Sequence, residues 1–455
     1  MDFAKLRSVL RGQVVTDEDA LRDVSTDFGR LVRSQPEAIV VPASSQDIQR
    51  AIEFANLEAC PVAIRGAGHS QSGQSVSRGG LLIDMMALNR VYRIEGDAVW
   101  VDAGITWREL VDRLRPKRLI PPVLTNNLSV TVGGSLSVGG MGVASHRFGT
   151  QADNVEALEV ITGTGDVAVC SAGENVDLFN AVRAGLGQFG IIARAKLRLR
   201  PYSENVRTYY LLYDSPDRLL ADQTEILHDQ RFDFIEGWCS PCVQGMRNLG
   251  GTRVAFGEWF FPVQVSVEYA DAAPGDSVLS GLRFYRHVHT EDARLIDYVQ
   301  RMDAVFERWY ESGAWKLPHP WMEVLLPWDR VADYLEGVVR SLPPHLPGEG
   351  HLLLWPCRGT VSEAPMLARP DGEFVMGFGI LPAVPRRELE MVLALLRKAS
   401  DLAIQVGAKR YLSGWVEFDR EGWKAHFGSQ WPRVLEWKSF FDPNGILNPD
   451  FVQYS

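Results

Sequence analysis

The residues whose types and spacing best suit binding or catalysis lie in one glycine-rich loop, Arg65 to Gln74, which follows a short apolar strand. Gly66, Gly68 and Gly73 allow successive backbone amides to approach an anionic ligand such as a pyrophosphate. His69 lies between these glycines, although a lone histidine is more often structural. The glycine spacing differs from G-x-G-x-x-G and no clean helix start follows. We therefore do not expect a nicotinamide site.

A second stretch, Asn126 to Gly142, is rich in glycine, serine and threonine. Such a segment packs poorly by itself but lets its backbone amides contact a ligand closely. We expect a bound ligand to fill the space beside it.

The cysteines do not indicate a metal site. There are five of them, an odd and scattered set that is typical of reduced thiols. Cys239 and Cys242 have the spacing of a metal or redox pair, but no second pair or nearby histidine accompanies them. We interpret them as a chance pair in a loop.

The pattern of elements divides the chain near Pro201. Before it, predicted helices and strands alternate at short intervals, including a helix from Ser45 to Glu58 that Ser45 caps. After it, glycines become rarer, and longer helices and strands predict a sheet covered by helices. These later elements are helices over Pro216–Leu227, Asp292–Trp309 and Pro385–Gln405, and strands over Arg253–Phe256 and His351–Trp355. The last forty residues are interpreted as a short, turn-rich segment that folds back onto an existing domain.

Composition limits the class of partner. With 455 residues the chain exceeds what one hydrophobic core usually serves, so two domains are expected. A net charge of −10 without basic stripes disfavours nucleic acid or an anionic membrane, and favours a small-molecule partner. Charges within Met1–Arg7 interrupt any secretory signal, and no apolar run approaches a membrane span. We expect a cytoplasmic protein, with no signal for its oligomeric state.

Several ordered motifs resemble the vanillyl-alcohol-oxidase-type (PCMH-type) FAD-linked oxidoreductases. They are Gly68-His69-Ser70 with Gly73-Gln74, the segment Thr131–Ser137, and the segment Gly185–Ile192. Within that group the chain is most similar to the cytokinin dehydrogenases, through His319-Pro320-Trp321, Trp423–Gly428 and Phe441-Asp442-Pro443.

The resemblance implies an α+β fold with a two-part FAD-binding domain, residues 1–204 and the returning segment 416–455, and a substrate domain, residues 205–415, with an antiparallel sheet covered by helices. His69 matches the family histidine that bonds to the flavin 8α-methyl group. A second link would need a cysteine between Asn126 and Gly142, and none is present, so one covalent link is predicted. The other positions matched to cofactor binding are Arg65, Gly66, Ala67, Gly68, Ser70, Gln74, Thr131, Gly134, Ser137, Ile192, Tyr411 and Asn448.

Two departures from the family bear on the substrate. Asn126 stands where cytokinin dehydrogenases have an aspartate that accepts a proton from the substrate amine. An amide cannot serve as that base, although it can orient a substrate by hydrogen bonds or be a plain loop residue. Near the C-terminal end, Asn448-Pro449-Asp450-Phe451 replaces the family's Ser-Pro-Gly-Gln. Both departures argue for an altered substrate.

Replacement catalytic groups are sought in the second domain. Asn126, Glu323 and Tyr411 are the catalytic candidates, with water as another route for the proton. Each residue named in this paragraph could also have only a structural role, because tryptophans usually pack in the core and lone charges usually face solvent. Arg358, if it faces the substrate, would suit a carboxylate or other electron-rich group. The positions expected to contact substrate are Trp321, Glu323, Trp355, Arg358 and Trp415.

The resemblance implies an enzyme that transfers hydride from a C–H next to nitrogen or oxygen to the flavin, giving an imine or a carbonyl. Oxygen or another acceptor would then reoxidise the flavin. Amine oxidation like that of cytokinin dehydrogenases, with an altered substrate, is the main hypothesis. The alternatives are an alcohol, sugar or secondary-metabolite tailoring oxidase of the same fold, and a non-catalytic flavin-binding protein.

Overall fold

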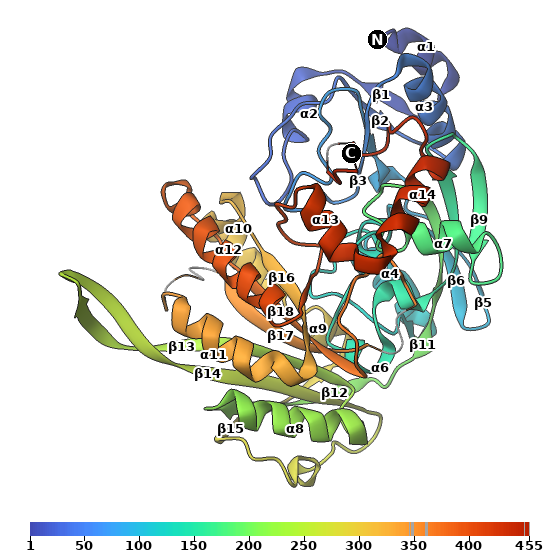
Figure 1. The fold of residues 1–455 in the computed structure, drawn as a ribbon. Coiled ribbons are helices and arrows are strands. Elements are labelled where there is room, and N and C mark those ends of the chain that lie inside the picture. The colour runs from blue at the N-terminus through green and yellow to red at the C-terminus, as the bar shows by residue number, and fades with distance from the viewer. Residues whose placement is uncertain (345, 347–349, 360–362, 450, 455) are drawn as a thin grey trace.

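The computed structural model describes residues 1–344, 346, 350–359, 363–449 and 451–454. Two regions lie against each other (Figure 1). The N-terminal region comprises residues 1–204 together with the chain after residue 415, and the middle region comprises residues 205–415. The larger hydrophobic core fills the N-terminal region and reaches the middle sheet, and a second core lies between that sheet and its helices. The expected α+β class is confirmed.

A small mixed sheet begins the N-terminal region, in the order β1-β2-β4-β3. Its strands are β1 Gln13–Val15, β2 Ala38–Val41, β3 Val62–Arg65 and β4 Leu81–Asp84. Helix α3 (Ser45–Glu58) packs beside it and buries Ile48, Ile52 and Ala55. The predicted helix is correct, but its N-cap is Ser44 rather than Ser45, and no side-chain cap bond forms.

An antiparallel sheet in the order β5-β6-β10-β8-β9 completes the N-terminal region. Helix α4 (Trp107–Leu114) is capped by Thr106. The spacing of Thr106 and Glu109 is typical of a capping box, and the two residues form one reciprocally. The sheet strands are β5 Val91–Glu95, β6 Ala98–Asp102, β8 Val155–Thr162, β9 Val167–Ser171 and β10 Gly190–Arg198, and a separate pair is β7 Leu119–Ile120 with β11 Arg200–Pro201. The remaining helices of this region are α1 Phe3–Val9, α2 Glu18–Asp23, α5 Val132–Leu136, α6 Ser145–Phe148 and α7 Val176–Val182, with 3-10 turns η1 Met85–Ala87, η2 Arg115–Lys117 and η3 Gln151–Asn154.

The middle region is built on an eight-stranded antiparallel sheet in the order β15-β12-β14-β13-β17-β18-β16-β19. Its strands are β12 Asn205–Tyr213, β13 Phe234–Leu249, β14 Thr252–Tyr269, β15 Arg286–Arg294, β16 Met322–Pro327, β17 His351–Arg358, β18 Phe374–Leu381 and β19 Lys409–Arg410. Helices α8 (Pro216–Asp229), α11 (Val331–Ser341) and α12 (Leu389–Gln405) cover one face of it (Figure 1). None of the described helices is long and apolar enough to cross a membrane.

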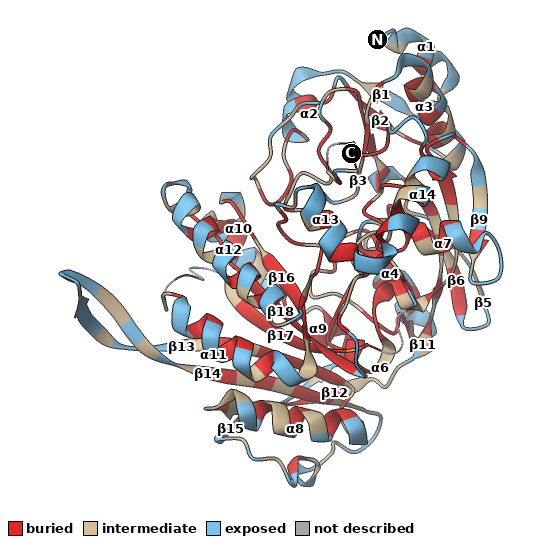
Figure 2. Ribbon diagram, in the orientation of Figure 1, coloured by how far each residue is buried: buried red, intermediate tan, exposed pale blue. Residues whose placement is uncertain are grey.

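Alternation along the strands decides which residues face the N-terminal region. Because side chains of a strand point to opposite faces in turn, Met322, Val324 and Leu326 of β16 pack into the core beneath the helices. Glu323 and Leu325 therefore point to the other face. Figure 2 shows that the helix surfaces turned away from this sheet are exposed, as is the far end of the long β13–β14 hairpin.

Two element predictions fail. The predicted helix over residues 292–309 is wrong, because β15 continues to Arg294, and α9 (Leu295–Val299) and α10 (Asp303–Ser312) follow as separate helices. Asp292 is held in the strand by pairing with Arg207, whose guanidinium donates to both carboxylate oxygens at 2.9 and 2.6 Å. The remaining 3-10 turns of the middle region are η4 Asp276–Leu279, η5 Ala314–Lys316, η6 Trp328–Arg330 and η7 Arg386–Glu388.

The last forty residues are also more regular than their sequence predicts. They contain α13 (Arg420–Phe427), the turn η8 (Gly428–Gln430) and α14 (Trp431–Phe441). Both helices lie on the N-terminal region (Figure 1). Asp450, within the segment that departs from the family, lies outside the described residues.

The chain beyond α14 is tied to the first sheet. Leu447 pairs with Val62 as a parallel bridge, and the Asn448 amide donates to the Val62 carbonyl at 2.8 Å. The buried Asp442 carboxylate accepts from the Leu447 amide at 2.9 Å and from Lys438 Nζ at 2.7 Å. The C-terminal segment therefore extends the edge at β3 and supports the loop that leaves it.

Asp442→Ala tests this tether. Removing the carboxylate leaves the buried Lys438 ammonium without its counterion, which costs about 3–5 kcal/mol. We expect the free energy of unfolding in urea to fall by that amount. The matched control is Asp177→Ala, because the Asp177–Arg433 pair is half exposed and its loss costs about 1 kcal/mol or less. Equal losses in the two variants would contradict a special role for Asp442.

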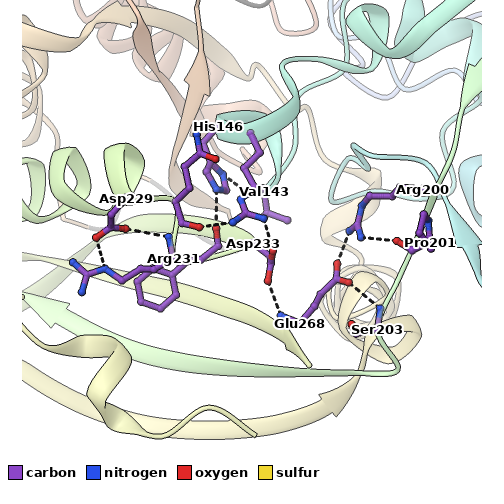
Figure 3. Close-up of polar contacts among 12 residues, drawn as sticks. Val143, His146, Arg200, Pro201, Ser203, Asp229, Arg231, Asp233 and Glu268 are labelled. Carbon is purple, nitrogen blue, oxygen red and sulfur yellow. Dashed lines mark hydrogen bonds and ion pairs between the residues drawn. The ribbon is translucent and has the colours of Figure 1, made fainter. Parts of the chain in front are cut away.

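A network of polar contacts joins the two regions (Figure 3). The ring nitrogens of the buried His146 lie 3.2 Å from the Val143 and the Phe232 carbonyl oxygens, one in each region. Arg147 forms an ion pair with Asp233 at the start of β13. Asp233 in turn accepts from the Glu268 amide at 2.7 Å. These contacts fix how the middle sheet sits against the N-terminal region.

Candidate active site

A cavity of about 290 Å³ lies where the two regions meet. The N-terminal region contributes three segments, within residues 64–75, 125–143 and 186–192. The middle region contributes Glu236 from β13, Trp321, and residues of β16, β17 and β18. No lysine or arginine is among the described residues that line it. Its polar groups are therefore backbone amides, hydroxyls, the side-chain amides of asparagine and glutamine, histidines and carboxyls.

The loop after β3 is held by the buried carboxylate of Asp27. Its Oδ2 accepts from the Ser70 hydroxyl at 2.9 Å and from the Gly73 amide at 2.7 Å, and the Ser70 and Ser75 hydroxyls lie 2.7 Å apart. Burial raises the pKa of Asp27 to about 6. Gly68 has φ +68°, a conformation that favours glycine, and a Cβ there would lie 2.4 Å from the Arg65 guanidinium. The loop is therefore fixed on both sides of His69.

Aromatic rings surround His69. Its imidazole stacks on Phe28 with centroids 4.1 Å apart, and Trp321 lies 5.5 Å away. The other face of Phe28 stacks on His319 at 4.1 Å. Burial lowers the pKa of His69 to about 4, so the ring is neutral at pH 7. Its Nε2 is buried without a hydrogen-bond partner among the described residues, which leaves a nitrogen of a neutral, nucleophilic ring unused by the protein.

Asn126 belongs to a cluster that the sequence did not reveal. Its side-chain amide donates to Glu236 Oε1, and Arg301 Nη2 donates to Asn126 Oδ1 at 2.9 Å and to Glu236 Oε2 at 2.7 Å. Glu236 is only 2% exposed and lines the cavity. The one sequence signal was a glutamate inside the apolar run Phe234–Trp238, where an acidic residue is unexpected in a buried strand.

Glu323 and Tyr411 also line the cavity. The Ser413 hydroxyl donates to Glu323 Oε2. Burial raises the pKa of Glu323 to about 7. Tyr411 is buried, and its hydroxyl oxygen accepts the Gly140 amide at 3.0 Å. Tyr411 thereby fastens the glycine-rich stretch to the middle region.

Trp355 forms another part of this wall. Its indole lies across Gly377 of the neighbouring strand β18, where a Cβ would lie 2.9 Å from the Trp355 Nε1 atom. The glycine thus makes room for the indole against the sheet. The cavity side of the sheet is accordingly flat and aromatic.

Comparison with known proteins agrees with this arrangement. Residues 36–171 match a family described as FAD binding domain, and residues 266–451 match one described as cytokinin dehydrogenase 1, FAD and cytokinin binding. Cytokinin dehydrogenase 6 of Oryza sativa subsp. japonica is 35% identical over 483 residues, which cover 95% of this chain and 90% of that protein. The chain belongs to the cytokinin dehydrogenase family. It is an FAD-dependent oxidoreductase.

Other relatives match over a similar length. An oxidoreductase of the fasciation locus of Rhodococcoides fascians is 34% identical over 438 residues, 96% of this chain and 98% of that protein. Cytokinin dehydrogenase 2 of Arabidopsis thaliana is 28% identical over 475 residues, 95% of this chain and 92% of that protein.

The cavity fits the FAD of the cytokinin dehydrogenase family. Three glycine-rich segments supply backbone amides along one side, with no bulky side chain at Gly66, Gly134 or Gly187. The unpartnered Nε2 of His69 lies in the same wall. The groups that this wall offers to hold FAD are therefore backbone amides and His69 rather than basic side chains.

Most of the residues predicted from the sequence meet at this cavity. Those that line it are Gly66, Ala67, Gly68, His69, Ser70, Gln74, Asn126, Thr131, Gly134, Ser137, Ile192, Trp321, Glu323, Trp355 and Tyr411.

Four predicted residues do not line the cavity. Arg65 donates to the carbonyls of Thr26 and Ser75, and Asn448 donates to the Gln74 carbonyl at 3.0 Å, so both hold the loop around His69. Trp415 is buried in the core beneath the helices. Arg358 lies 3.8 Å from Glu373, a half-exposed partner. None of the described residues that line the cavity is a lysine or arginine that could pair with a carboxylate of the substrate.

Glu323→Gln should change how stability depends on pH. The carboxyl has its pKa raised from 4.5 to about 7 in the folded protein, so between these values only the folded state holds the proton. The contribution of Glu323 to the free energy of unfolding therefore falls as pH rises, by at most about 3 kcal/mol between pH 4.5 and 8. We expect urea midpoints of the glutamine variant to decline less over this range than those of the wild type. Parallel profiles would show that burial does not shift this carboxyl.

Proposed function

We propose that the protein oxidises a small organic amine at the C–H bond next to its nitrogen, using FAD bound covalently through His69. The observation that carries this proposal is the Asn126–Glu236–Arg301 cluster in the wall of the cavity that His69 also lines. It restores a carboxylate beside the position where the family's aspartate is replaced by Asn126. When bound, FAD would accept the hydride, which carries the two electrons of the oxidation.

The environment of His69 supports covalent attachment. The loop around it is fixed by Asp27, and Phe28 holds the plane of the imidazole. Because its pKa is lowered to about 4, the ring needs no base to become a nucleophile at neutral pH. A fixed, neutral imidazole with a free nitrogen is a suitable nucleophile for a C–N bond to the flavin 8α-carbon. That carbon would lose one hydrogen as a proton, and the two electrons of the broken C–H bond would pass through the flavin to oxygen or another acceptor.

His69→Ala tests the tether directly. Acid precipitation of the wild-type protein should leave yellow flavin in the pellet, whereas the variant should release its flavin into the supernatant. The control is His351→Ala, because His351 lines the same cavity from β17 and should not affect attachment. Release of all flavin from the wild type would contradict the tether.

Glu236 is the proposed acceptor for the proton of the substrate N–H. Arg301, paired with it at 2.7 Å, is the counterion of this buried carboxylate and fixes its position. Asn126 orients the second carboxylate oxygen through its amide hydrogen. A carboxylate oxygen has two lone pairs, so Glu236 can accept a substrate N–H in addition to these bonds. The proton leaves the nitrogen as the hydride leaves the neighbouring carbon, and an imine results.

Glu236→Gln should lower the rate of anaerobic flavin reduction about 10²- to 10⁴-fold, the usual contribution of a positioned base. Because this change leaves Arg301 buried without a counterion, Glu236→Gln combined with Arg301→Met is the matched variant that removes the charge pair together. N-(3-Methylbut-2-enyl)aniline is a suitable donor, and recovery of aniline and the matching aldehyde would identify imine hydrolysis. A glutamine variant that reduces its flavin at the wild-type rate would refute the role of Glu236. Oxygen and a quinone, supplied separately, would identify the electron acceptor.

A further inference from the structure

The two carboxyls in the cavity wall differ in how their charge is balanced. Glu236 has Arg301 as a counterion at 2.7 Å. Glu323 has no ion pair among the described residues, and its carboxylate receives only the Ser413 hydroxyl there. Its side chain is 7% exposed. An isolated carboxylate this deeply buried is costly unless a cation approaches it.

Arg410 lies against the backbone of β16, but each of its three guanidinium nitrogens donates to a group other than the Glu323 carboxylate. Its Nε donates to the Glu323 backbone carbonyl at 3.2 Å and its Nη1 donates to Ser400 at 3.1 Å. Its Nη2 donates to the Trp415 carbonyl. The guanidinium thus braces the backbone around β16 rather than pairing with the Glu323 carboxylate.

The surroundings of Glu323 suit a cation. Trp321 and Trp355 line the same cavity, and tryptophan faces attract positive charge. Trp355 is only 7% exposed, and its indole N–H has no hydrogen-bond partner among the described residues. The wall thus offers an uncompensated carboxyl, two indoles and a free donor, and lacks any described basic side chain.

We propose that Glu323 is a substrate-recognition residue that binds a cationic group of the donor, so that the preferred substrate is an amine carrying a second, protonated nitrogen. The reacting nitrogen would lie at Glu236 and the cationic group at Glu323. This inference rests on the proposed amine oxidation, because it assigns the far end of the same substrate.

The test compares two probes of equal size in the flavin-loaded enzyme at pH 8.5. One is 4-(tert-butylamino)benzamidine, a cation, and the other is 4-(tert-butylamino)benzamide, which is neutral. Neither has a C–H bond on a carbon attached to nitrogen or oxygen, so binding is measured by calorimetry without turnover. We expect the wild type to bind the cation about tenfold or more tightly than the neutral probe, as a charge-assisted contact provides.

Variants test whether Glu323 causes the preference for the cationic probe. Glu323→Gln should bring the two affinities to within about twofold, because a neutral amide offers hydrogen bonds without charge, and Glu323→Asp should retain a preference. Glu373→Gln removes a half-exposed carboxylate that pairs with Arg358 outside the described cavity wall, and should behave as the wild type. Equal affinities in the wild type, or a preference that survives Glu323→Gln, would overturn the assignment.

Flavin reduction by the matching N-(3-methylbut-2-enyl) amines separates the two proposals. If both amines reduce the flavin but calorimetry finds no preference for the cation, recognition by Glu323 is refuted and amine oxidation stands. If calorimetry finds the preference but neither amine reduces the flavin, recognition stands and amine oxidation is refuted.

Discussion

The structure depends on a rigid junction between two hydrophobic cores. One core lies within the N-terminal region and the other lies beneath the middle sheet, so the cavity between them keeps its shape only if the regions cannot slide. His146 reaches the carbonyls of both regions, and Arg147 with Asp233 adds a half-buried ion pair (Figure 3). Such contacts are directional, and they specify one relative placement where apolar packing alone would allow several.

The geometry of the candidate active site depends on this placement of the two regions. Asn126 comes from the glycine-rich stretch of the N-terminal region, whereas Glu236 and Arg301 come from the middle region, yet the three form one hydrogen-bonded cluster. A shift of about 1 Å at the junction would move Glu236 away from the substrate nitrogen whose proton it is proposed to accept, and misplacement of that size costs about 10²-fold in rate. Asp233 directly precedes β13, which carries Glu236 three residues later. The placement of the two regions and the proposed catalytic group therefore depend on one short segment.

Sequence reasoning succeeded where the signal was local. The glycine loop around His69, the capping box at Thr106 and the helix α3 follow from spacing and residue type, and the family motifs extended this reading to most of the cavity wall. It missed Glu236 and Arg301, because their meeting with Asn126 depends on how a strand and a helix end pack across the junction. It placed a helix over residues 292–309, where an ion pair between Arg207 and Asp292, 85 positions apart in the chain, favours a strand.

Arg358 and Trp415 illustrate the same limit. Their types suit a substrate pocket, but Trp415 lies in the loop after β19 and packs into the second core, and Glu373 lies beside Arg358 of β17. The face that a strand residue occupies depends on which side of the sheet the rest of the chain covers, and motif order alone does not contain that information.

The tie between Asn448 and the carbonyl of Gln74 also sets an order of events during synthesis. The two residues are 374 positions apart, so the loop that carries His69 leaves the ribosome long before the segment that braces it. At bacterial or eukaryotic elongation rates this interval lasts on the order of tens of seconds. During that time the nascent loop lacks its bond to Asn448. The support of the loop that carries His69 is therefore completed only after the segment around Asn448 has been synthesised.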